Sequence, residues 1–457
     1  MGFQTQNPAT GEILQEYDHL SADEVDKRIE AAFESFHHQK SKTVAQKSGS
    51  LHKLAQALRQ ESQDLGELMT LEMGKPIRDS KAEIEKCAVT FEYFAEKLPE
   101  FLAHKNVSLD KHEGKIFKES LGPVLAVMPW NFPIWQVVRF AAPAVGIGNP
   151  ILLKHSDLTA GTAEKLTQIF ESVEKGLMFN LRIDHTQASR VIGDKRVRGV
   201  TLTGSTRAGR EVAATAGRYL KKSVMELGGS DAYVVFADSD VKKAGEICAK
   251  SRLINNGQSC ISAKRFLVEQ SVRDEFLESF ISTLRTLPFA DPRKPETLTG
   301  SLASKKFQKQ LLSQCQELEK NKAELLYDAS REKKFDFSVP GAFFPSRIYQ
   351  VNSDMDMAFQ EEFFGPVALL FEFESSIQAL GLANRSVYGL GGAVFTRDME
   401  KAQHFARQME CGFVAVNDFV RSDARLPFGG VKDSGFGREL SQYGFDEFCN
   451  VKSLAFG

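Results

Sequence analysis

Short apolar runs alternate with longer amphipathic segments through most of this chain, and this alternation is the feature that most constrains its fold. Each run is short enough for one buried strand, and the first series comprises 123–128, 150–154, 198–204 and 222–227. Segments that suit helices lie between the runs. This alternation is typical of a parallel sheet covered by helices on both faces. A second series predicts another such sheet and includes 232–237, 265–269, 367–373, 391–396 and 412–418.

The length of 457 residues is too great for one hydrophobic core, so we expect two or three domains. Apolar residues recur at helical spacing in the first hundred residues, for example at Leu51, Leu54, Ala55 and Leu58. The same spacing makes Cys87 a core residue. Residues 100–118 are polar and mixed, which predicts a hairpin or an extension. The sequence therefore indicates two α/β domains with a polar extension.

Charge and cysteine usage exclude several classes of protein. Lys and Arg number 58 against 60 Asp and Glu, so no basic surface is predicted for nucleic acid or an anionic membrane. No apolar run approaches the length of a membrane span. The six cysteines form no CxxC pair, so we expect neither a metal site nor a disulfide framework. The first residues lack a basic, apolar leader, and we expect a cytoplasmic protein.

The segment NNGQSC, which ends at Cys260, places a thiol among polar residues directly after an apolar stretch. A free cysteine often behaves as a small hydrophobic residue in a core, and Cys260 could be inert. It could also be a nucleophile, which requires exposure and a lowered pKa or a nearby base. Cys260 alone does not decide between these alternatives.

Polar residues follow several predicted strands, where ligands bind in open α/β sheets. The segment TGSTRAG contains Ser205, which could present backbone N–H groups to a phosphate or could simply cap a helix. The segment PWNFP presents Asn131 between an aromatic residue and Phe-Pro. The segment LLKHSD contains Lys154 and Asp157, which could contact ribose or phosphate or could be solvated surface charges.

Glu226 lies in the apolar run of the segment MELGGSD, just before two glycines. Burying a carboxylate is costly unless it is paired or functional, and burial raises its pKa toward the range of a general base. The segment EEFFGP likewise contains acidic residues, here beside two aromatic residues and a Gly-Pro turn. The glycine-rich segment 426–440 suits the wall of a site.

Together these motifs resemble the NAD(P)-dependent aldehyde dehydrogenase family. PWNFP, TGSTRAG, MELGGSD, NNGQSC, EEFFGP and PFGGVKDSGFGRE have counterparts there in the same order. The resemblance covers about residues 5 to 457. Within the family the chain looks most like the succinate-semialdehyde dehydrogenases, through KHSD, MELGGSD, AKRF and SDARLPFGGVKDSGFGRELS.

The resemblance implies three catalytic residues. Cys260 matches the nucleophile, whose thiolate attacks the aldehyde to give a thiohemiacetal that loses hydride to nicotinamide. Asn131 matches the side-chain donor to the oxyanion, beside the backbone N–H of Cys260. Glu226 matches the base that activates water to hydrolyse the resulting thioester.

The resemblance also implies a cofactor site and a substrate site. Residues expected to bind NAD, with NADP also accepted, are Trp130, Lys154, Asp157, Ser205, Glu362 and Phe364. Asp157 should repel a 2′-phosphate, so NAD is the expected preference. Arg139 and Ser422 are expected to bind the carboxylate of succinic semialdehyde, although Arg139 could instead pair with an acid inside the protein.

The implied fold is a Rossmann-like dinucleotide-binding domain joined to an α/β catalytic domain. We assign residues 1–100 and 119–228 to the first and 229–430 to the second. Residues 101–118 and 444–457 are expected to form a small β extension for assembly into a homodimer or homotetramer.

Two departures from the resembled group concern the active-site region. Ile254 stands where many semialdehyde dehydrogenases have an arginine, with Arg252 nearby, and Ser262 replaces the second cysteine of a redox switch. A general aldehyde dehydrogenase is one alternative. A CoA-acylating aldehyde dehydrogenase is a second, which Glu226 disfavours because this base would hydrolyse the acyl-enzyme. A catalytically silent binding or structural protein is another alternative, which the intact catalytic residues disfavour.

Overall fold

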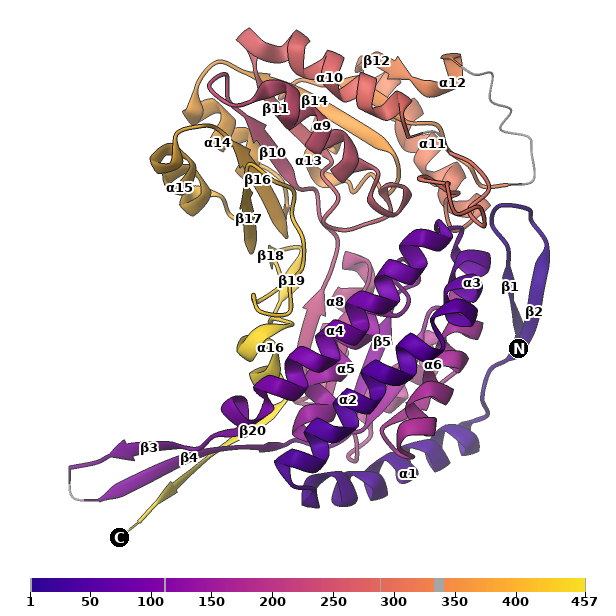
Figure 1. Cartoon of the computed structure of the whole chain (residues 1–457), viewed down its shortest axis with the longest axis vertical. Helices are drawn as coiled ribbons and strands as arrows, with labels where there is room; N and C mark the ends of the chain where they lie inside the picture. The colour runs from indigo at the N-terminus through magenta and orange to yellow at the C-terminus, as the bar shows by residue number, and fades with distance from the viewer. Residues whose placement is uncertain (1, 111, 288, 333–340, 457) are drawn as a thin grey trace.

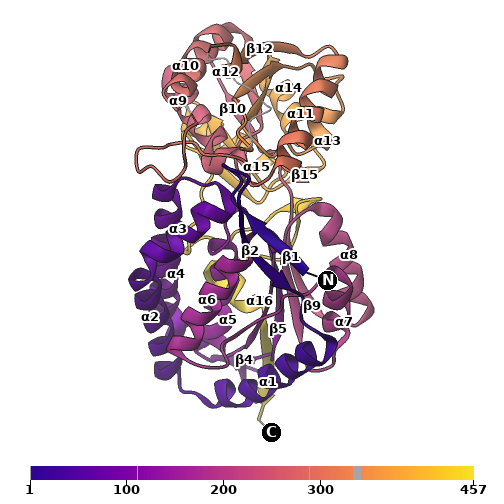
Figure 2. The same cartoon turned by 90° about the vertical axis from the view of Figure 1, so that its right-hand side faces the viewer.

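The chain forms two α/β lobes, with a narrow antiparallel sheet protruding from one of them (Figure 1). The structure is a computed structural model that describes residues 2–110, 112–287, 289–332 and 341–456. The first lobe contains the N-terminal half of the chain, and the second is built mainly from residues after 230 (Figures 1 and 2).

The first lobe is built on a six-stranded sheet of order β19-β9-β8-β5-β6-β7. All neighbouring strands are parallel except β19, which is antiparallel to β9. The strands are β5 (Val124–Met128), β6 (Ile151–His155), β7 (Met178–Asn180), β8 (Gly199–Thr203), β9 (Lys222–Glu226) and β19 (Gly435–Phe436). The four predicted runs thus form β5, β6, β8 and β9, whereas β7 lies in a segment with no clear sequence signal.

Helices cover this sheet on both sides, and a hairpin precedes them. The hairpin is β1 (Gly2–Gln6) with β2 (Ile13–Asp18). The helices are α1 (Ala22–Ser41), α2 (Val44–Gln60), α3 (Ser62–Met73), α4 (Ile77–Leu102), α5 (Trp135–Ile147), α6 (Ala160–Val173), α7 (His185–Gly193) and α8 (Thr206–Arg218). The predicted apolar faces of α2 and α4, Cys87 included, lie in one buried core with α5 and the strands.

The second lobe contains a seven-stranded sheet of order β12-β13-β14-β11-β10-β16-β17, parallel except for β12. Its strands are β10 (Ala232–Val235), β11 (Arg265–Glu269), β12 (Glu324–Asp328), β13 (Arg347–Gln350), β14 (Val367–Phe373), β16 (Gly391–Phe395) and β17 (Phe413–Val416). The five predicted runs of the second series form β10, β11, β14, β16 and β17. The two strands at one edge, β12 and β13, were not predicted.

Helices pack on this second sheet, and several short elements lie in the connections along the chain. The helices are α9 (Val241–Arg252), α10 (Arg273–Arg285), α11 (Lys305–Lys320), α12 (Ala329–Glu332), α13 (Met357–Gln360), α14 (Ser376–Asn384) and α15 (Met399–Gln408). The short elements are η1 (Asp157–Thr159), η2 (Ile254–Gly257), η3 (Gln270–Val272), β15 (Tyr388–Gly389), β18 (Val431–Lys432) and α16 (Ser441–Glu447).

The protruding sheet consists of β3 (Lys105–Ser108), β4 (Glu113–Ser120) and β20 (Cys449–Ala455) (Figure 1). β20 pairs with β4 along its whole length and forms an edge of this sheet. Residues 450–455 of β20 are exposed. Within the described part of the chain, no helix is both long and apolar enough to cross a membrane. The division of the chain into domains and the assembly role of the extension stay predictions.

Candidate active site

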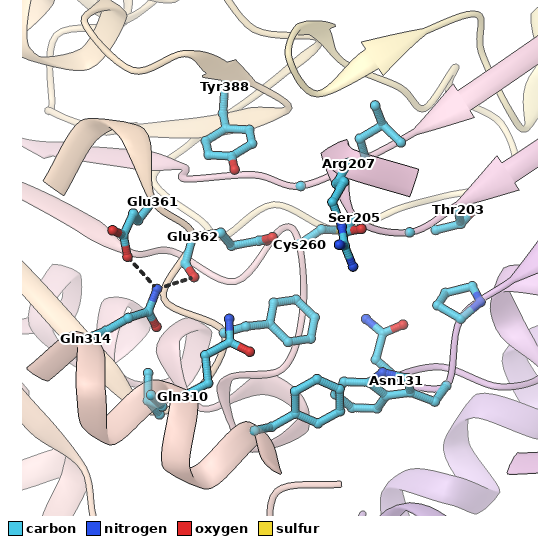
Figure 3. Close-up of a pocket in the computed structure, with 18 of the residues that line it drawn as sticks. Asn131, Thr203, Ser205, Arg207, Cys260, Gln310, Gln314, Glu361, Glu362 and Tyr388 are labelled. Atoms are coloured by element: carbon cyan, nitrogen blue, oxygen red, sulfur yellow. Dashed lines mark hydrogen bonds between the residues drawn. The ribbon is translucent and has the colours of Figure 1, made fainter. Parts of the chain in front are cut away.

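A cavity of about 660 Å³ opens where three strands of the first sheet end and face the second lobe (Figure 3). Pro129, Trp130 and Asn131 follow β5, Gly204 and Ser205 follow β8, and Leu227 and Gly228 follow β9. The second lobe contributes Cys260, Phe307, Glu362, Phe364 and Tyr388. Ligands of open α/β sheets bind at this carboxyl edge. The structure thus brings six predicted site residues to one cavity: Trp130, Asn131, Ser205, Cys260, Glu362 and Phe364.

The loop before Cys260 has an unusual backbone conformation that the segment NNGQSC explains. Asn255, Asn256 and Gly257 all have positive φ angles, of 53°, 58° and 79°. Asparagine and glycine tolerate this left-handed region best. A side chain at Gly257 would also overlap the backbone of Gly365, at 2.4 Å from its carbonyl carbon. The sequence therefore fixes a tight turn that directs the next residues to the cavity.

Cys260 is partly exposed to the cavity, although protein surrounds the thiol. Burial raises the pKa of the Cys260 thiol to about 12, against the opposing positive charges of Arg139 and Lys264. The other cysteines are buried, apart from the partly exposed Cys411. In this state Cys260 is a protonated thiol at neutral pH, and a nucleophilic attack requires that the proton be removed.

Asn131 is buried beside Cys260 and is tied to the same loop. Its amide nitrogen donates to the Gln258 carbonyl at 3.1 Å, and the Asn255 amide donates to the Asn131 carbonyl at 2.7 Å. An amide nitrogen has two hydrogens, and this bond uses one of them. Asn131 is therefore held close to the nucleophile with donor capacity left, as an oxyanion site requires.

A buried ion pair that the sequence did not reveal fixes the Asn131 loop. Glu83 on α4 pairs with Lys75, and both side chains are almost fully buried. The Glu83 carboxylate also accepts from the backbone N–H groups of Ile134 and Trp135, at 2.9 and 2.8 Å. It thus caps the start of α5 from a distant part of the chain.

Glu226 ends β9 but does not line the cavity. Its carboxyl is buried, and a side chain at Gly429 would lie 2.7 Å from one of its oxygens. Burial, and next the negative charge of Glu439, raise the pKa of Glu226 well above its usual range, while Arg139 opposes them. The expected raised pKa is present, and its role as a base stays a prediction.

The aromatic and acidic residues of the cavity suit one end of a dinucleotide. Trp130 stacks on Phe307 with ring centroids 4.7 Å apart and meets the edge of Phe364 at 5.7 Å. Glu362 accepts from the Gly229 N–H at 3.0 Å, and its carboxylate lies 3.5 Å from the Lys264 ammonium. These contacts hold Glu362 in a defined orientation at the cavity (Figure 3).

Ser205 has the capping role that was one of its two interpretations. Its hydroxyl accepts from the Ala208 N–H at 3.3 Å at the start of α8, and Ser205 also lines the cavity. Lys154 and Asp157 lie outside the cavity lining, at the end of β6. Their charged groups are 3.8 Å apart, and Asp157 lies 4.0 Å from His19. Asp157 is therefore a paired charge at the sheet edge.

Arg139 forms the internal ion pair that was its alternative interpretation. Its guanidinium contacts the Glu439 carboxylate at 2.8 Å and lies over the Phe428 ring at 4.6 Å. Both charged side chains are almost fully buried. Ser422 contacts a lysine instead, because its hydroxyl accepts from Lys86 at 2.8 Å. A direct role of Arg139 and Ser422 in substrate binding stays a prediction.

Comparison with known proteins identifies the family of this chain. The model of the aldehyde dehydrogenase family matches residues 1–454. A Deinococcus radiodurans protein named succinate-semialdehyde dehydrogenase [NADP(+)] is 40% identical over 98% of this chain and 94% of its own length. The Escherichia coli K12 succinate semialdehyde dehydrogenase [NAD(P)+] Sad is 37% identical over 98% of this chain and 96% of its own.

Solved structures give the same result for the fold. The succinic semialdehyde dehydrogenase from Streptococcus pyogenes, in complex with NADP+, superposes with a TM-score of 0.95 at 36% identity. The alignment covers 99% of each chain. A structure of Gox0499 gives a TM-score of 0.96, also at 36% identity, over the whole of both chains. The chain therefore belongs to the aldehyde dehydrogenase family, whose NAD(P)-dependent members oxidise aldehydes.

Proposed function

We propose that this enzyme oxidises succinic semialdehyde to succinate and reduces NAD(P)+. The observation that carries the proposal is the placement of Cys260 and Asn131 on one cavity in a chain whose relatives are named for this reaction. The four-carbon substrate has an aldehyde at one end and a carboxylate at the other, so the enzyme must react with one and bind the other.

The Cys260 thiol gives up its proton to water, and the resulting thiolate attacks the aldehyde carbon and forms a carbon–sulfur bond. The carbonyl oxygen becomes an oxyanion, and the Asn131 amide and the Cys260 N–H stabilise it. Loss of a hydride from this carbon gives a thioester. Water deprotonated by Glu226 then adds to the thioester and releases the acid and the thiol. Glu226 does not line the cavity in this structure, so we expect its side chain to move toward Cys260 for this step.

The cavity has the chemistry that a nicotinamide dinucleotide requires. The start of α8, with Ser205 and Arg207 beside it, faces the cavity and suits a pyrophosphate. Glu362 suits ribose hydroxyls, and Trp130 and Phe364 form an aromatic wall. Lys154 and Asp157 would meet the other ribose at the end of β6. Bound there, NAD(P)+ would supply the acceptor for the hydride.

The edge strand β20 supports assembly with further copies of the chain. Its backbone pairs on one side only, and Val451 and Leu454 are exposed on it. An unpaired, partly apolar edge is a surface for strand addition. A homodimer or homotetramer is part of the proposal.

An aldehyde panel with NAD+ and NADP+, with and without coenzyme A, tests the proposed reaction. We expect succinic semialdehyde to be oxidised with a much higher kcat/KM than butanal, and succinate to form without coenzyme A. Formation of succinyl-CoA as the main product would support the acylating alternative. No turnover of any aldehyde would support the silent protein.

A further inference from the structure

A second cavity lies on the other side of the loop that carries Asn131. Its volume is about 530 Å³. Phe132 and Trp135, from this loop and the start of α5, line it, while Asn131 and Gln136 line the first cavity. Asn255, whose amide binds the Asn131 carbonyl, also lines the second cavity. The catalytic loop therefore contributes residues to both cavities.

Lys86, on α4, brings a positive charge to this second cavity. Its ammonium lies 4.0 Å from the centre of the Trp135 ring and donates to the Ser422 hydroxyl at 2.8 Å. Because Ser422 accepts this bond through its oxygen, its own O–H remains able to donate. Lys86 and Ser422 thus present two donors side by side, from elements far apart in the sequence.

No carboxylate of the described residues lies within ion-pair distance of Lys86. The arginines nearest in sequence to Ile254 and Ser422 are engaged by the protein. Arg252 donates to the carbonyls of Ala263 and Gly257, and Arg421 and Arg425 pair with Asp418 and Asp423. The Lys86 ammonium, by contrast, contacts only a hydroxyl and an aromatic ring among the described residues, those of Ser422 and Trp135.

The surroundings of Lys86 make a bound anion favourable. Burial, and next the positive charge of Arg139, lower the pKa of Lys86 to about 8. A lysine in this state gains from any carboxylate that joins it, because the anion offsets both the lost hydration and the repulsion. The positive charge of Arg139 also lowers the pKa of the Cys260 thiol. Arg139 therefore acts electrostatically on both Lys86 and Cys260.

We propose that Lys86, together with the Ser422 hydroxyl, binds the distal carboxylate of the aldehyde substrate and sets the preference for an acidic aldehyde. The inference rests on the proposed function, because Lys86 and Ser422 would supply the anion site that oxidation of succinic semialdehyde needs. It assigns this role to a lysine of α4 in a chain with Ile254 at the position of the expected arginine. Phe132 and Trp135 would line the path from this site to Cys260.

The variant Lys86→Met tests the assignment while keeping the apolar stem over Trp135. We expect kcat/KM for succinic semialdehyde to fall about ten- to a hundred-fold, the usual effect of losing one charge-assisted contact, with butanal unchanged. Lys86→Arg should keep most of the preference. The matched control is Arg78→Met, which removes a cation of the same cavity that is already paired with Asp79.

A second measurement separates this inference from the proposed function. Succinate should inhibit butanal oxidation in the wild type, and Lys86→Met should weaken this inhibition by a similar factor. If the wild type uses both aldehydes equally, the proposed substrate is wrong, and succinate inhibition still reports on the anion site. An unchanged preference and unchanged inhibition in Lys86→Met would overturn the assignment. An equal loss with both aldehydes would assign Lys86 a structural role instead.

Discussion

Three buried charged groups, Glu226, Glu439 and Arg139, should set the pH dependence of thioester hydrolysis. Arg139 contacts Glu439 directly, and Glu439 is the largest cause after burial of the raised pKa of Glu226. The Arg139 guanidinium therefore interacts with two carboxyl groups, with Glu439 by direct contact and with Glu226 through its charge. Glu439→Gln removes one of these negative charges and keeps the shape of the side chain.

The direction of the effect follows from the role of Glu226 as a base. A general base acts when deprotonated, so deacylation should speed up as the pH rises through its raised pKa. Without the charge of Glu439, Arg139 favours the ionised form of Glu226 and the pKa falls. Strongly interacting groups shift each other by about one pKa unit or more, and one unit is about 1.4 kcal/mol. The rising limb of the plot of deacylation rate against pH should therefore move to lower pH by about one unit.

Single-turnover kinetics measure this step. The enzyme forms the acyl intermediate in a burst, and its hydrolysis is followed by intact mass across the neutral and alkaline range. Glu226→Gln should remove the limb and slow hydrolysis by about 10²- to 10⁴-fold. Glu410→Gln, an exposed glutamate paired with Lys432, should leave the limb in place. A limb that stays fixed in Glu439→Gln, or that moves to higher pH, would refute the reasoning.

Two further substitutions test the nucleophile and the loop that positions Asn131. Cys260→Ser should lower turnover by orders of magnitude and leave NAD(P)+ binding intact in a fluorescence titration, because a hydroxyl is not ionised at neutral pH; Cys411→Ser is its control, and retained activity in Cys260→Ser would end this assignment. Glu83→Ala should reduce the free energy of unfolding by about 3–5 kcal/mol in denaturant titrations, since it leaves Lys75 charged and unpaired in the interior. A loss within the error of the titration would show that the pair is not needed.

The parts of the fold that the sequence predicted are those with a strong local pattern. Continuous apolar runs identified the central strands of both sheets, because such strands are buried on both faces. Among the strands that were missed, β1, β7 and β12 are at edges, and β13 is next to one. In β1 only one of five residues is buried, and β12 begins with an exposed residue, so neither has a continuous apolar run. The short β7 has three residues and offers too little pattern for any prediction.

The candidate site, like the fold, could be predicted from the sequence only in part. Cys260 and Asn131 were predicted to lie together, and their loop contacts bring them to one cavity. The partners of Arg139 and Glu226 could not be predicted, because pairing of buried charges depends on how distant segments pack. Lys86 was hidden for another reason. It precedes Cys87 on a helix whose apolar spacing indicated only a core.

The expected preference for NAD+ over NADP+ depends on the negative charge of Asp157. The structure shows a nearby positive charge that weakens this expectation. Asp157 was expected to repel a 2′-phosphate, yet its carboxylate lies 3.8 Å from the Lys154 ammonium, which offsets its charge. Asp157→Asn should therefore raise kcat/KM for NADP+ relative to NAD+, because it removes the repulsion and frees Lys154. The carboxylate is about half exposed, so the effect should correspond to about 0.2–1 kcal/mol, up to about five-fold, and should shrink as salt is added. Asp354→Asn, which makes the same charge change at an exposed position of the second lobe, should not alter the ratio. An unchanged ratio in Asp157→Asn, or a shift toward NAD+, would show that Asp157 does not face the ribose.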